Sequence, residues 1–304
     1  MNLTPPPPGQ PKPAPRCPIC ESIQAIALGK WTHGYDRLRC SDCGLFFADP
    51  FENTSNMYSH EYASEGAYNF ALDVARNVKA GKKSLGWPYQ VLLKHLKGMG
   101  IKGSLFEVGC GSGYFIYYMQ RQGWKALGCD VDATAVQAAK EILNVDVIHT
   151  DFNASIAEDG SLDVLVAFEV IEHLKNPVGF LKLASVKLKK GGYLYLSTPN
   201  ASTKWPTHWR KERTVLPPFH LTVFSEQPLQ RASEKAGFEV VEFVQKPVPY
   251  RYEFMEEGYS KPRLFFETFK AFLQGIKGVT ILAVLRNKGI GFSANRGSNA
   301  ASAP

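Results

Sequence analysis

The chain has 304 residues, 44% of them hydrophobic and 21% charged, which is enough to bury one large core and to carry one small additional module. No uncharged apolar run approaches the roughly 18 residues that suggest a transmembrane helix, and the proline-rich start has no apolar segment of the kind found in signal peptides. The net charge of +7 favours an anionic partner, whether a phosphorylated small molecule, a nucleic acid or a membrane surface.

Four of the six cysteines form two CxxC units near the N-terminus. Cys17 and Cys20 make the first unit, and Cys40 and Cys43 make the second after nineteen intervening residues. This spacing is typical of tetrahedral four-cysteine zinc sites, and a redox role or chance spacing is the alternative. Since four thiolates fill the coordination of zinc, residues 17–50 are predicted to form a zinc ribbon with a structural ion, in a protein of the reducing cytoplasm.

Beyond residue 103 the chain alternates short apolar runs with helical stretches. The expected strands are 104–109, 125–130, 145–150, 163–168, 193–198, 238–244 and 278–285. The expected helices between them are 114–123, 133–144 and 177–192, the last with glycines at its end. Strands that alternate with helices of this length imply βαβ units, so we expect an α/β fold with a doubly wound, mostly parallel sheet of seven strands.

A glycine-rich turn follows the first of these strands. Gly109, Gly111 and Gly113 lead directly into a helix, Glu107 precedes them, and the next strand ends at Asp130. Glycines allow a sharp turn and a close approach to a ligand, while a carboxylate at the second strand end can accept hydrogen bonds from both hydroxyls of a ribose. A purely structural turn is the alternative. The pattern favours a nucleoside ligand at the carboxyl ends of the strands.

The pattern E-x-G-x-G-x-G resembles motif I of class I S-adenosylmethionine-dependent methyltransferases, and the resemblance extends from about residue 58 to residue 285. It also includes EVIEHLKNP, LKKGGYLYLSTPN and PPFHLTVFS. The resemblance implies that the three glycines flank the methionine moiety of S-adenosylmethionine and that Glu107 supports it. It further implies cofactor contacts at Asp130 with the ribose, at Val131 with the adenine face, at Asp151 and Phe152 with the adenine edge, and at Phe168.

Glu169, Glu172 and His173 are spaced i, i+3 and i+4, so they share one face if residue 169 opens a helix. The group is either a polar helix start or a functional cluster. A histidine suits a general base for an acceptor hydroxyl, and two carboxylates with an imidazole suit a divalent cation.

The E-x-x-E-H cluster is similar to a metal-binding cluster in ubiquinone-pathway catechol methyltransferases and in small-RNA 3′-terminal 2′-O-methyltransferases. In the RNA group a downstream histidine completes the site, and His220 occupies the matching context here. We therefore expect metal-assisted or histidine-assisted O-methyl transfer, with Glu169, Glu172, His173 and His220 as catalytic residues or cation ligands.

The front end of the chain, CPIC followed by CGLFFADP and a tyrosine-rich stretch, resembles bacterial methyltransferases that act on sugars or other small molecules. The ribbon either binds a nucleic acid or a carrier, or caps the acceptor pocket. The few basic residues of the ribbon and of the tail before it (Lys12, Arg16, Lys30, Arg37 and Arg39) form no dense stripe, which favours a small-molecule acceptor. An RNA methyltransferase and a catalytically silent cofactor-binding scaffold are the alternatives.

Two further segments carry aromatic residues. In residues 200–220, Trp205, Trp209, Arg210 and Arg213 are expected to form an acceptor lid or a solvated loop. In residues 250–274, Phe265, Phe266, Phe269 and Phe272 have the spacing of a helix that packs in the core or against another subunit. The predicted modules are a disordered tail (1–16), the ribbon (17–50), a helical linker or cap (51–102), the methyltransferase domain (103–287) and a second disordered tail (288–304).

Overall fold

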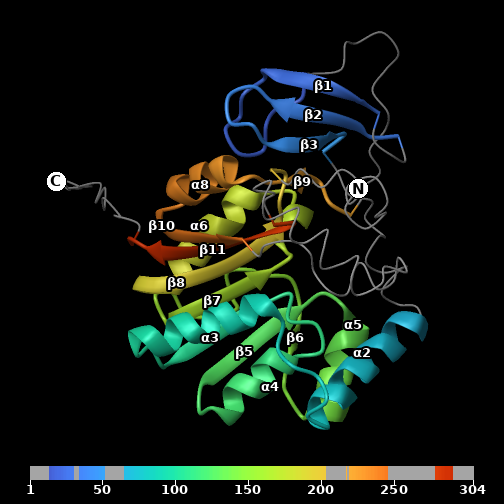
Figure 1. The fold of residues 1–304 in the computed structure, drawn as a ribbon, viewed down its shortest axis with the longest axis vertical. Coiled ribbons are helices and arrows are strands. Elements are labelled where there is room, and N and C mark those ends of the chain that lie inside the picture. The colour runs from blue at the N-terminus through green and yellow to red at the C-terminus, as the bar shows by residue number, and fades with distance from the viewer. Residues whose placement is uncertain are drawn as a thin grey trace, which may run out of the picture.

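The computed structural model describes residues 14–30, 34–51, 65–202, 217, 219–245 and 278–289. The lid and the phenylalanine-bearing helix expected from the sequence lie outside these residues. Two sheets organise the described part of the chain (Figure 1). Within that part, no helix combines the length and the apolar character that crossing a bilayer requires.

The larger sheet has seven strands in the order β10-β11-β8-β7-β4-β5-β6. Its strands are β4 (Ser104–Val108), β5 (Lys125–Asp130), β6 (Ile148–His149), β7 (Leu162–Phe168), β8 (Leu188–Pro199), β10 (Phe238–Gln245) and β11 (Thr280–Asn287). β4 to β8 run parallel to their neighbours in this set, and β11 is antiparallel to both β8 and β10. The predicted fold class, a mostly parallel seven-stranded α/β sheet, is confirmed.

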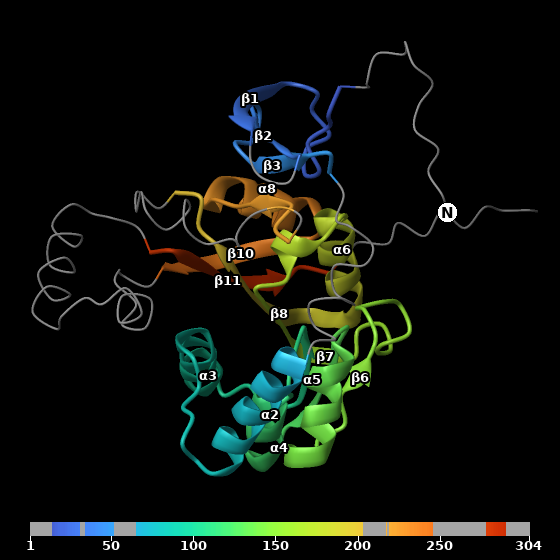
Figure 2. The same ribbon diagram turned by 90° about the vertical axis from the view of Figure 1, so that its right-hand side faces the viewer.

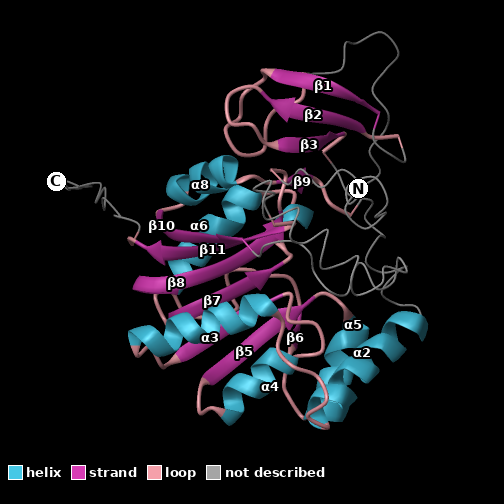
Figure 3. Ribbon diagram, viewed as in Figure 1, coloured by secondary structure: helices cyan, strands magenta, loops and turns pink. Residues whose placement is uncertain are grey.

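Helices cover both faces of this sheet because side chains alternate along each strand (Figures 2 and 3). The helices are α2 (Glu65–Lys79), α3 (Trp87–Met99), α4 (Tyr114–Arg121), α5 (Ala133–Ala138), α6 (Pro177–Lys187) and α8 (Glu226–Lys235). Leu105, Val164 and Tyr195 join the buried cluster that includes residues of α3 and α4. Their neighbours in sequence, Phe106, Leu165 and Leu196, join the cluster that includes residues of α6 and α8.

The smaller sheet contains the cysteine-bearing segment. β1 (Ala25–Lys30), β2 (Asp36–Cys40) and β3 (Phe46–Asp49) form an antiparallel meander. A fourth strand, β9 (Thr222–Val223), pairs with β3 although it is distant from β3 in the sequence. The meander lies beside α8, at the opposite end of the molecule from α2 (Figures 1 and 2).

The helix expected over residues 177–192 ends earlier than the glycines suggested. α6 stops at Lys187, and β8 begins at Leu188. The amide of Asn287, on β11, donates to the carbonyl oxygens of Ser185 (2.8 Å), Leu188 (3.0 Å) and Lys189 (3.2 Å). A side chain distant in sequence therefore satisfies the end of this helix, in place of a glycine cap.

Two other boundaries also differ from expectation. The helix expected over residues 133–144 is α5 followed by a π-helical turn, Ala139–Leu143, which ends at Asn144 in the left-handed conformation (φ 54°). Only Ile148 and His149 of the strand expected over 145–150 pair with β5. Val145 is instead buried in the core, which shortens this edge strand.

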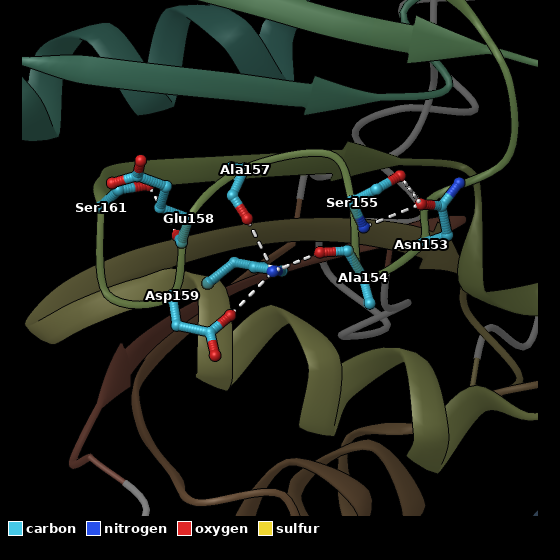
Figure 4. Close-up of polar contacts among 8 residues, drawn as sticks. Asn153, Ala154, Ser155, Ala157, Glu158, Asp159 and Ser161 are labelled. Carbon is cyan, nitrogen blue, oxygen red and sulfur yellow. Dashed lines mark hydrogen bonds and ion pairs between the residues drawn. The ribbon is translucent and has the colours of Figure 1, made fainter.

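A buried lysine fixes the connection between β6 and β7. Lys187 is 3% exposed, and its Nζ donates to the carbonyl oxygens of Ala154 (2.5 Å) and Ala157 (2.6 Å) and to Oδ1 of Asp159 (2.7 Å). Figure 4 shows these three oxygens converging on one nitrogen atom. Because three acceptors satisfy the buried ammonium, the loop that follows Asp151 has a defined path along α6.

Candidate functional site

A pocket of about 830 Å³ lies at the carboxyl ends of β4, β5 and β7. The sheet order reverses at this point, because β4 is followed by β5 on one side and has β7 on the other. Such a switch point is where open α/β sheets bind their ligands. The predicted residues that line the pocket are Gly109, Gly111, Asp130, Val131, Asp151, Phe152, Glu169 and His173.

The glycine turn has a backbone shape that other residues rarely adopt. Gly109 (φ 68°), Gly111 (φ 54°) and Gly113 (φ 68°) all have left-handed conformations. A Cβ atom on Gly109 would lie 2.8 Å from Cγ2 of Val170, so that position also lacks space for a side chain. Glycine is therefore required by both conformation and packing at the floor of the pocket.

The side chain of Asp130 connects the glycine turn to the turn at Asp132, which follows β5. Its Oδ2 accepts a hydrogen bond from the Gly111 amide (2.7 Å), and its Oδ1 accepts one from the Asp132 amide (2.8 Å). Burial raises the pKa of Asp130, although the backbone donors oppose that effect. Each carboxylate oxygen retains capacity for a further donor, and Val131 presents a side chain that is 45% exposed. A carboxylate next to an exposed apolar surface fits the ribose and base of a nucleoside.

The remaining predicted cofactor residues differ in their positions. Asp151 lies at the rim, where its Oδ1 accepts from the side-chain amide of Asn153 (3.2 Å). Phe152 packs between Phe106 (6.1 Å between ring centroids) and Phe180 (5.5 Å), and it forms part of the pocket wall. Phe168 does not line the pocket, because its ring packs against Tyr89 (4.8 Å) in the core beneath.

Glu107 is buried below the glycine turn. Its side chain is 1% exposed, and Oε1 accepts a hydrogen bond from the Tyr89 hydroxyl (2.7 Å). Oε2 has no hydrogen-bond partner among the described residues. Burial raises the pKa of Glu107 to about 8. Tyr89 was not predicted from the sequence, because a tyrosine on α3 carries no local pattern that connects it to Glu107.

Glu169 does not open a helix, so the predicted common face of Glu169, Glu172 and His173 is wrong. Glu169 has a left-handed backbone (φ 54°), and helical geometry is limited to a short 3₁₀ turn, Ile171–His173. The Ser197 hydroxyl donates to Oε1 of Glu169 (2.7 Å). The side chain is exposed to the pocket, yet the surrounding protein raises its pKa. The strand-to-turn transition thus places Glu169 on the pocket wall.

Glu172, His173 and His220 gather behind this wall. One nitrogen or oxygen atom from each lies within 4.8 Å of those of the other two. Oε1 of Glu172 and Nδ1 of His220 are buried without hydrogen-bond partners among the described residues. The two imidazole rings meet edge to face, 4.5 Å apart. The structure therefore brings together three of the four predicted catalytic residues in a group whose ligand atoms are close enough to hold one metal ion.

Burial is the main cause of the pKa shifts of Glu172, His173 and His220. It raises the pKa of Glu172 well above the usual range, and the charge of Glu169 adds to this effect. It lowers the pKa of His173, and it lowers that of His220 to about 3, with the neighbouring His173 contributing. Near neutral pH the two imidazoles are therefore uncharged and can act as ligands or bases.

The four N-terminal cysteines also converge. Their Sγ atoms lie within 4.8 Å of one another, with 3.5 Å between Cys17 and Cys43 and 3.5 Å between Cys20 and Cys40. Four sulfurs bound to one zinc at ~2.3 Å are separated by roughly 3.8 Å in a regular tetrahedron. The cysteine cluster is therefore consistent with the predicted zinc ribbon.

The ribbon is bonded to the segment that carries His220. Phe47 and Phe46 on β3 are register partners of Thr222 and Val223 on β9, and the Ala48 amide donates to the Leu221 carbonyl (2.9 Å). On the other side, the Leu221 amide donates to the carbonyl of Glu172 (2.9 Å). One short strand is thus shared between the ribbon and the histidine cluster.

The sequence model of a family described as a methyltransferase domain matches residues 62–243. The chain belongs to this family. A Mycolicibacterium smegmatis protein named "Probable S-adenosylmethionine-dependent methyltransferase" is 34% identical over 137 residues, which are 45% of this chain and 52% of that protein. A Dinoroseobacter shibae protein named ubiquinone biosynthesis O-methyltransferase is 30% identical over 156 residues, which are 44% of this chain and 62% of that one. The chain thus matches between half and two thirds of these relatives.

The fold of the methyltransferase domain also matches solved structures. The structure titled as the complex of the Haloferax volcanii Trm112 methyltransferase activator with its methyltransferase aligns with a TM-score of 0.52 and 19% identity. The alignment covers 77% of this chain and 98% of that chain. At this level of identity the likeness shows a shared fold.

We expect Glu107→Gln to reduce the pH dependence of stability. Glu107 ionises at its ordinary pKa of 4.5 when unfolded and at about 8 when folded, so between these values the folded state holds a proton that the unfolded state has lost. Stability therefore falls as the pH rises through this window. Glutamine does not ionise, so urea unfolding should show the variant gaining about 4 kcal/mol relative to the wild type between about pH 4 and about pH 9.

The exposed Glu158 provides a matched control, because Glu158→Gln removes a carboxylate from the surface and should leave the pH profile of unfolding unchanged. If Glu107→Gln and the wild type gave parallel profiles, Glu107 would be ionised in the folded protein.

Proposed function

We propose that this chain is an S-adenosylmethionine-dependent methyltransferase that transfers a methyl group to an oxygen atom of a small-molecule acceptor. The observation that carries the proposal is the bonding of Asp130 to the glycine turn at the edge of the pocket. Membership in the methyltransferase-domain family and relatives named S-adenosylmethionine-dependent methyltransferases support it. S-adenosylmethionine supplies an electrophilic methyl group on a sulfonium when it is bound.

In this proposal the residues of the pocket divide between the parts of the cofactor. The carboxylate of Asp130 accepts the ribose hydroxyls, and Val131 packs on the adenine face. Asp151 and Phe152 lie at the adenine edge. Gly109 and Gly111 let the backbone approach the methionine moiety, and Glu107 supports that moiety from below through its unpartnered Oε2.

An acceptor hydroxyl must lose a proton as it takes up a methyl group, and the Glu172–His173–His220 cluster is suited to that task. We propose that these three residues hold a divalent cation. Nδ1 of His173 bonds to the carbonyl of Phe219 (2.9 Å), and its Nε2 lies 4.0 Å from Oε1 of Glu172. At this separation both atoms would be able to contribute to the binding of one cation. Such a cation lowers the pKa of a bound hydroxyl.

The acceptor is proposed to be a small molecule such as a sugar or a phenol, and relatives named ubiquinone biosynthesis O-methyltransferase support transfer to oxygen. Basic side chains of the ribbon are engaged within the ribbon itself. Lys30 pairs with Asp36 (2.8 Å), Arg37 donates to the carbonyl of Leu28 (3.4 Å), and Arg39 lies over the Phe46 ring (5.7 Å). Dispersed and locally engaged charges favour a cap on the acceptor side over a surface that tracks a nucleic-acid backbone.

We further propose that the ribbon binds zinc and acts as this cap. β3 extends to β9, and α8 contacts the ribbon through Arg231, which donates to the Asp42 carbonyl (3.2 Å), and through Lys235, which pairs with Glu21 (2.8 Å). Ile19 and Phe47, both fully buried, share a core cluster with Phe224 and Leu229. The ribbon is thereby part of the same packed body as the pocket.

Isothermal titration calorimetry with S-adenosylhomocysteine tests the cofactor assignment. We expect Asp130→Ala to weaken binding by about 100-fold, because two hydrogen bonds to a charged acceptor and the support of Gly111 are lost. Asp146→Ala removes an exposed carboxylate from outside the pocket and should bind as the wild type does. A folded wild type that binds neither S-adenosylhomocysteine nor S-adenosylmethionine would refute the proposal.

Mn²⁺ serves as the probe for the cation site, with binding followed by electron paramagnetic resonance. We expect one bound Mn²⁺ per chain and at least about a tenfold loss of affinity in His220→Ala and Glu172→Gln, since each removes one ligand. Glu107→Gln is the matched control, because it alters a second buried glutamate outside the cluster. Retention of both Mn²⁺ binding and acceptor turnover in His173→Ala and His220→Ala would exclude this role.

The ribbon proposal predicts one zinc per chain by metal analysis and a local response to zinc removal. Chelation should speed hydrogen exchange at the backbone amides of Phe46–Asp49 and Leu221–Phe224, because the β3–β9 pairing loses its support. Cys40→Ser should have the same effect, whereas Cys110→Ser, outside the cluster, should keep both zinc and protection. Unchanged exchange in the zinc-free protein would contradict a capping role.

A further inference from the structure

One end of the pocket carries an ammonium group that has no anionic partner among the described residues. Lys83, in the loop after α2, lines the pocket, and its Nζ lies 5.5 Å from the centroid of the Tyr114 ring. The residue as a whole is exposed, yet neighbouring protein atoms lower the pKa of its ammonium. No carboxylate of the described residues offsets this effect. A cation in this state is stabilised by an anionic ligand.

The loop that carries Lys83 has a fixed path. Gly81 reverses the chain at the end of α2 with a left-handed backbone (φ 68°). The amides of Lys82 (2.8 Å) and Lys83 (3.2 Å) then both donate to the carbonyl of Asn77. Because the backbone on both sides of the turn is bonded to α2, the Lys83 side chain projects from an ordered position beside the pocket.

Two tyrosines connect Lys83 with the buried acid of the same region. Tyr114 follows Gly113 directly, and its ring meets the ring of Tyr89 edge to face at 5.4 Å. Tyr89 in turn donates its hydroxyl to Glu107. The lining at this end therefore combines one ammonium and two aromatic rings, and the buried Glu107 lies behind Tyr89 with one unpartnered oxygen.

The proposed cofactor has two chemically different ends. Its nucleoside end has an apolar base and two hydroxyls, for which Asp130 and Val131 provide the matching surface. Its other end is an α-amino acid with one carboxylate and one ammonium. We infer that Lys83 binds the α-carboxylate of S-adenosylmethionine, and this assignment rests on the proposed function.

Lys175 is the other lysine that lines the pocket, and its position differs. It precedes Asn176 and α6, where Phe180 packs against Phe152. That is the side of the pocket expected to receive the adenine edge. Lys175 therefore provides a control with the same charge and length, at the end of the pocket away from the expected position of the α-carboxylate.

Calorimetry with three ligands separates the contribution of the α-carboxylate to binding from that of the rest of the cofactor. The ligands are S-adenosylhomocysteine, its decarboxylated analogue and 5′-methylthioadenosine, which lacks the whole amino-acid end. We expect Lys83→Met to weaken S-adenosylhomocysteine by about 10-fold to 100-fold, as for loss of one charge-assisted hydrogen bond. Binding of the other two ligands should be unchanged, and Lys83→Arg should restore most of the affinity. Lys175→Met should leave the ratio of the affinities for S-adenosylhomocysteine and its decarboxylated analogue as it is in the wild type.

The outcomes separate the possible failures. Equal losses for S-adenosylhomocysteine and for its decarboxylated analogue would make Lys83 a structural residue and overturn the inference. No loss for any ligand would overturn it as well. A wild type that binds neither S-adenosylhomocysteine nor 5′-methylthioadenosine would instead overturn the cofactor assignment itself.

Discussion

The carboxylate of Asp130 is the constraint on which the rest of the pocket depends. By accepting from the amides of Gly111 and Asp132, it fixes two turns that each begin a helix, α4 and α5. The turns can approach because Gly128 has no side chain: a Cβ there would lie 2.5 Å from Ile116 and 2.7 Å from the carbonyl oxygen of Glu107. The distance between the two turns, and with it the shape of the ligand surface, is therefore set by one side chain and one close backbone contact.

The ribbon and the methyltransferase domain meet at His220. The carbonyl of Phe219 accepts from His173, while Leu221 bonds to Glu172 on one side and to Ala48 of the ribbon on the other. Both neighbours of His220 in the chain are therefore held by backbone hydrogen bonds, so the ribbon and the methyltransferase domain together fix the position of His220. Within the described residues, the pocket lining includes none from the ribbon. The ribbon is thus bonded to the segment that carries His220 without contributing to the lining of the pocket.

Local patterns were sufficient to predict the strands, the glycine turn with Asp130 and the paired cysteines, because each depends on periodicity, spacing or a backbone preference. The features that the sequence missed depend on contacts between distant segments. The amide of Asn287 ends α6, the left-handed backbone of Glu169 interrupts the expected helix, and β9 pairs with a ribbon far back in the chain. Lys83 and Tyr89 join the pocket only because α2 packs against α5 and α3 packs against the sheet, and no spacing in the sequence predicts that placement.

The pairing of β3 with β9 has a consequence for how the protein is made. Phe47 is synthesised about 175 residues before its partner Thr222, a delay of ~10 to 35 s at usual rates of translation. Throughout that interval the outer edge of β3 is an unsatisfied hydrogen-bonding edge on a nascent chain. The early arrival of four cysteines that can close around a metal gives the ribbon a means to fold by itself while it waits. Under the proposed zinc assignment, zinc supply during translation would bear on the yield of correctly assembled protein as well as on the finished molecule.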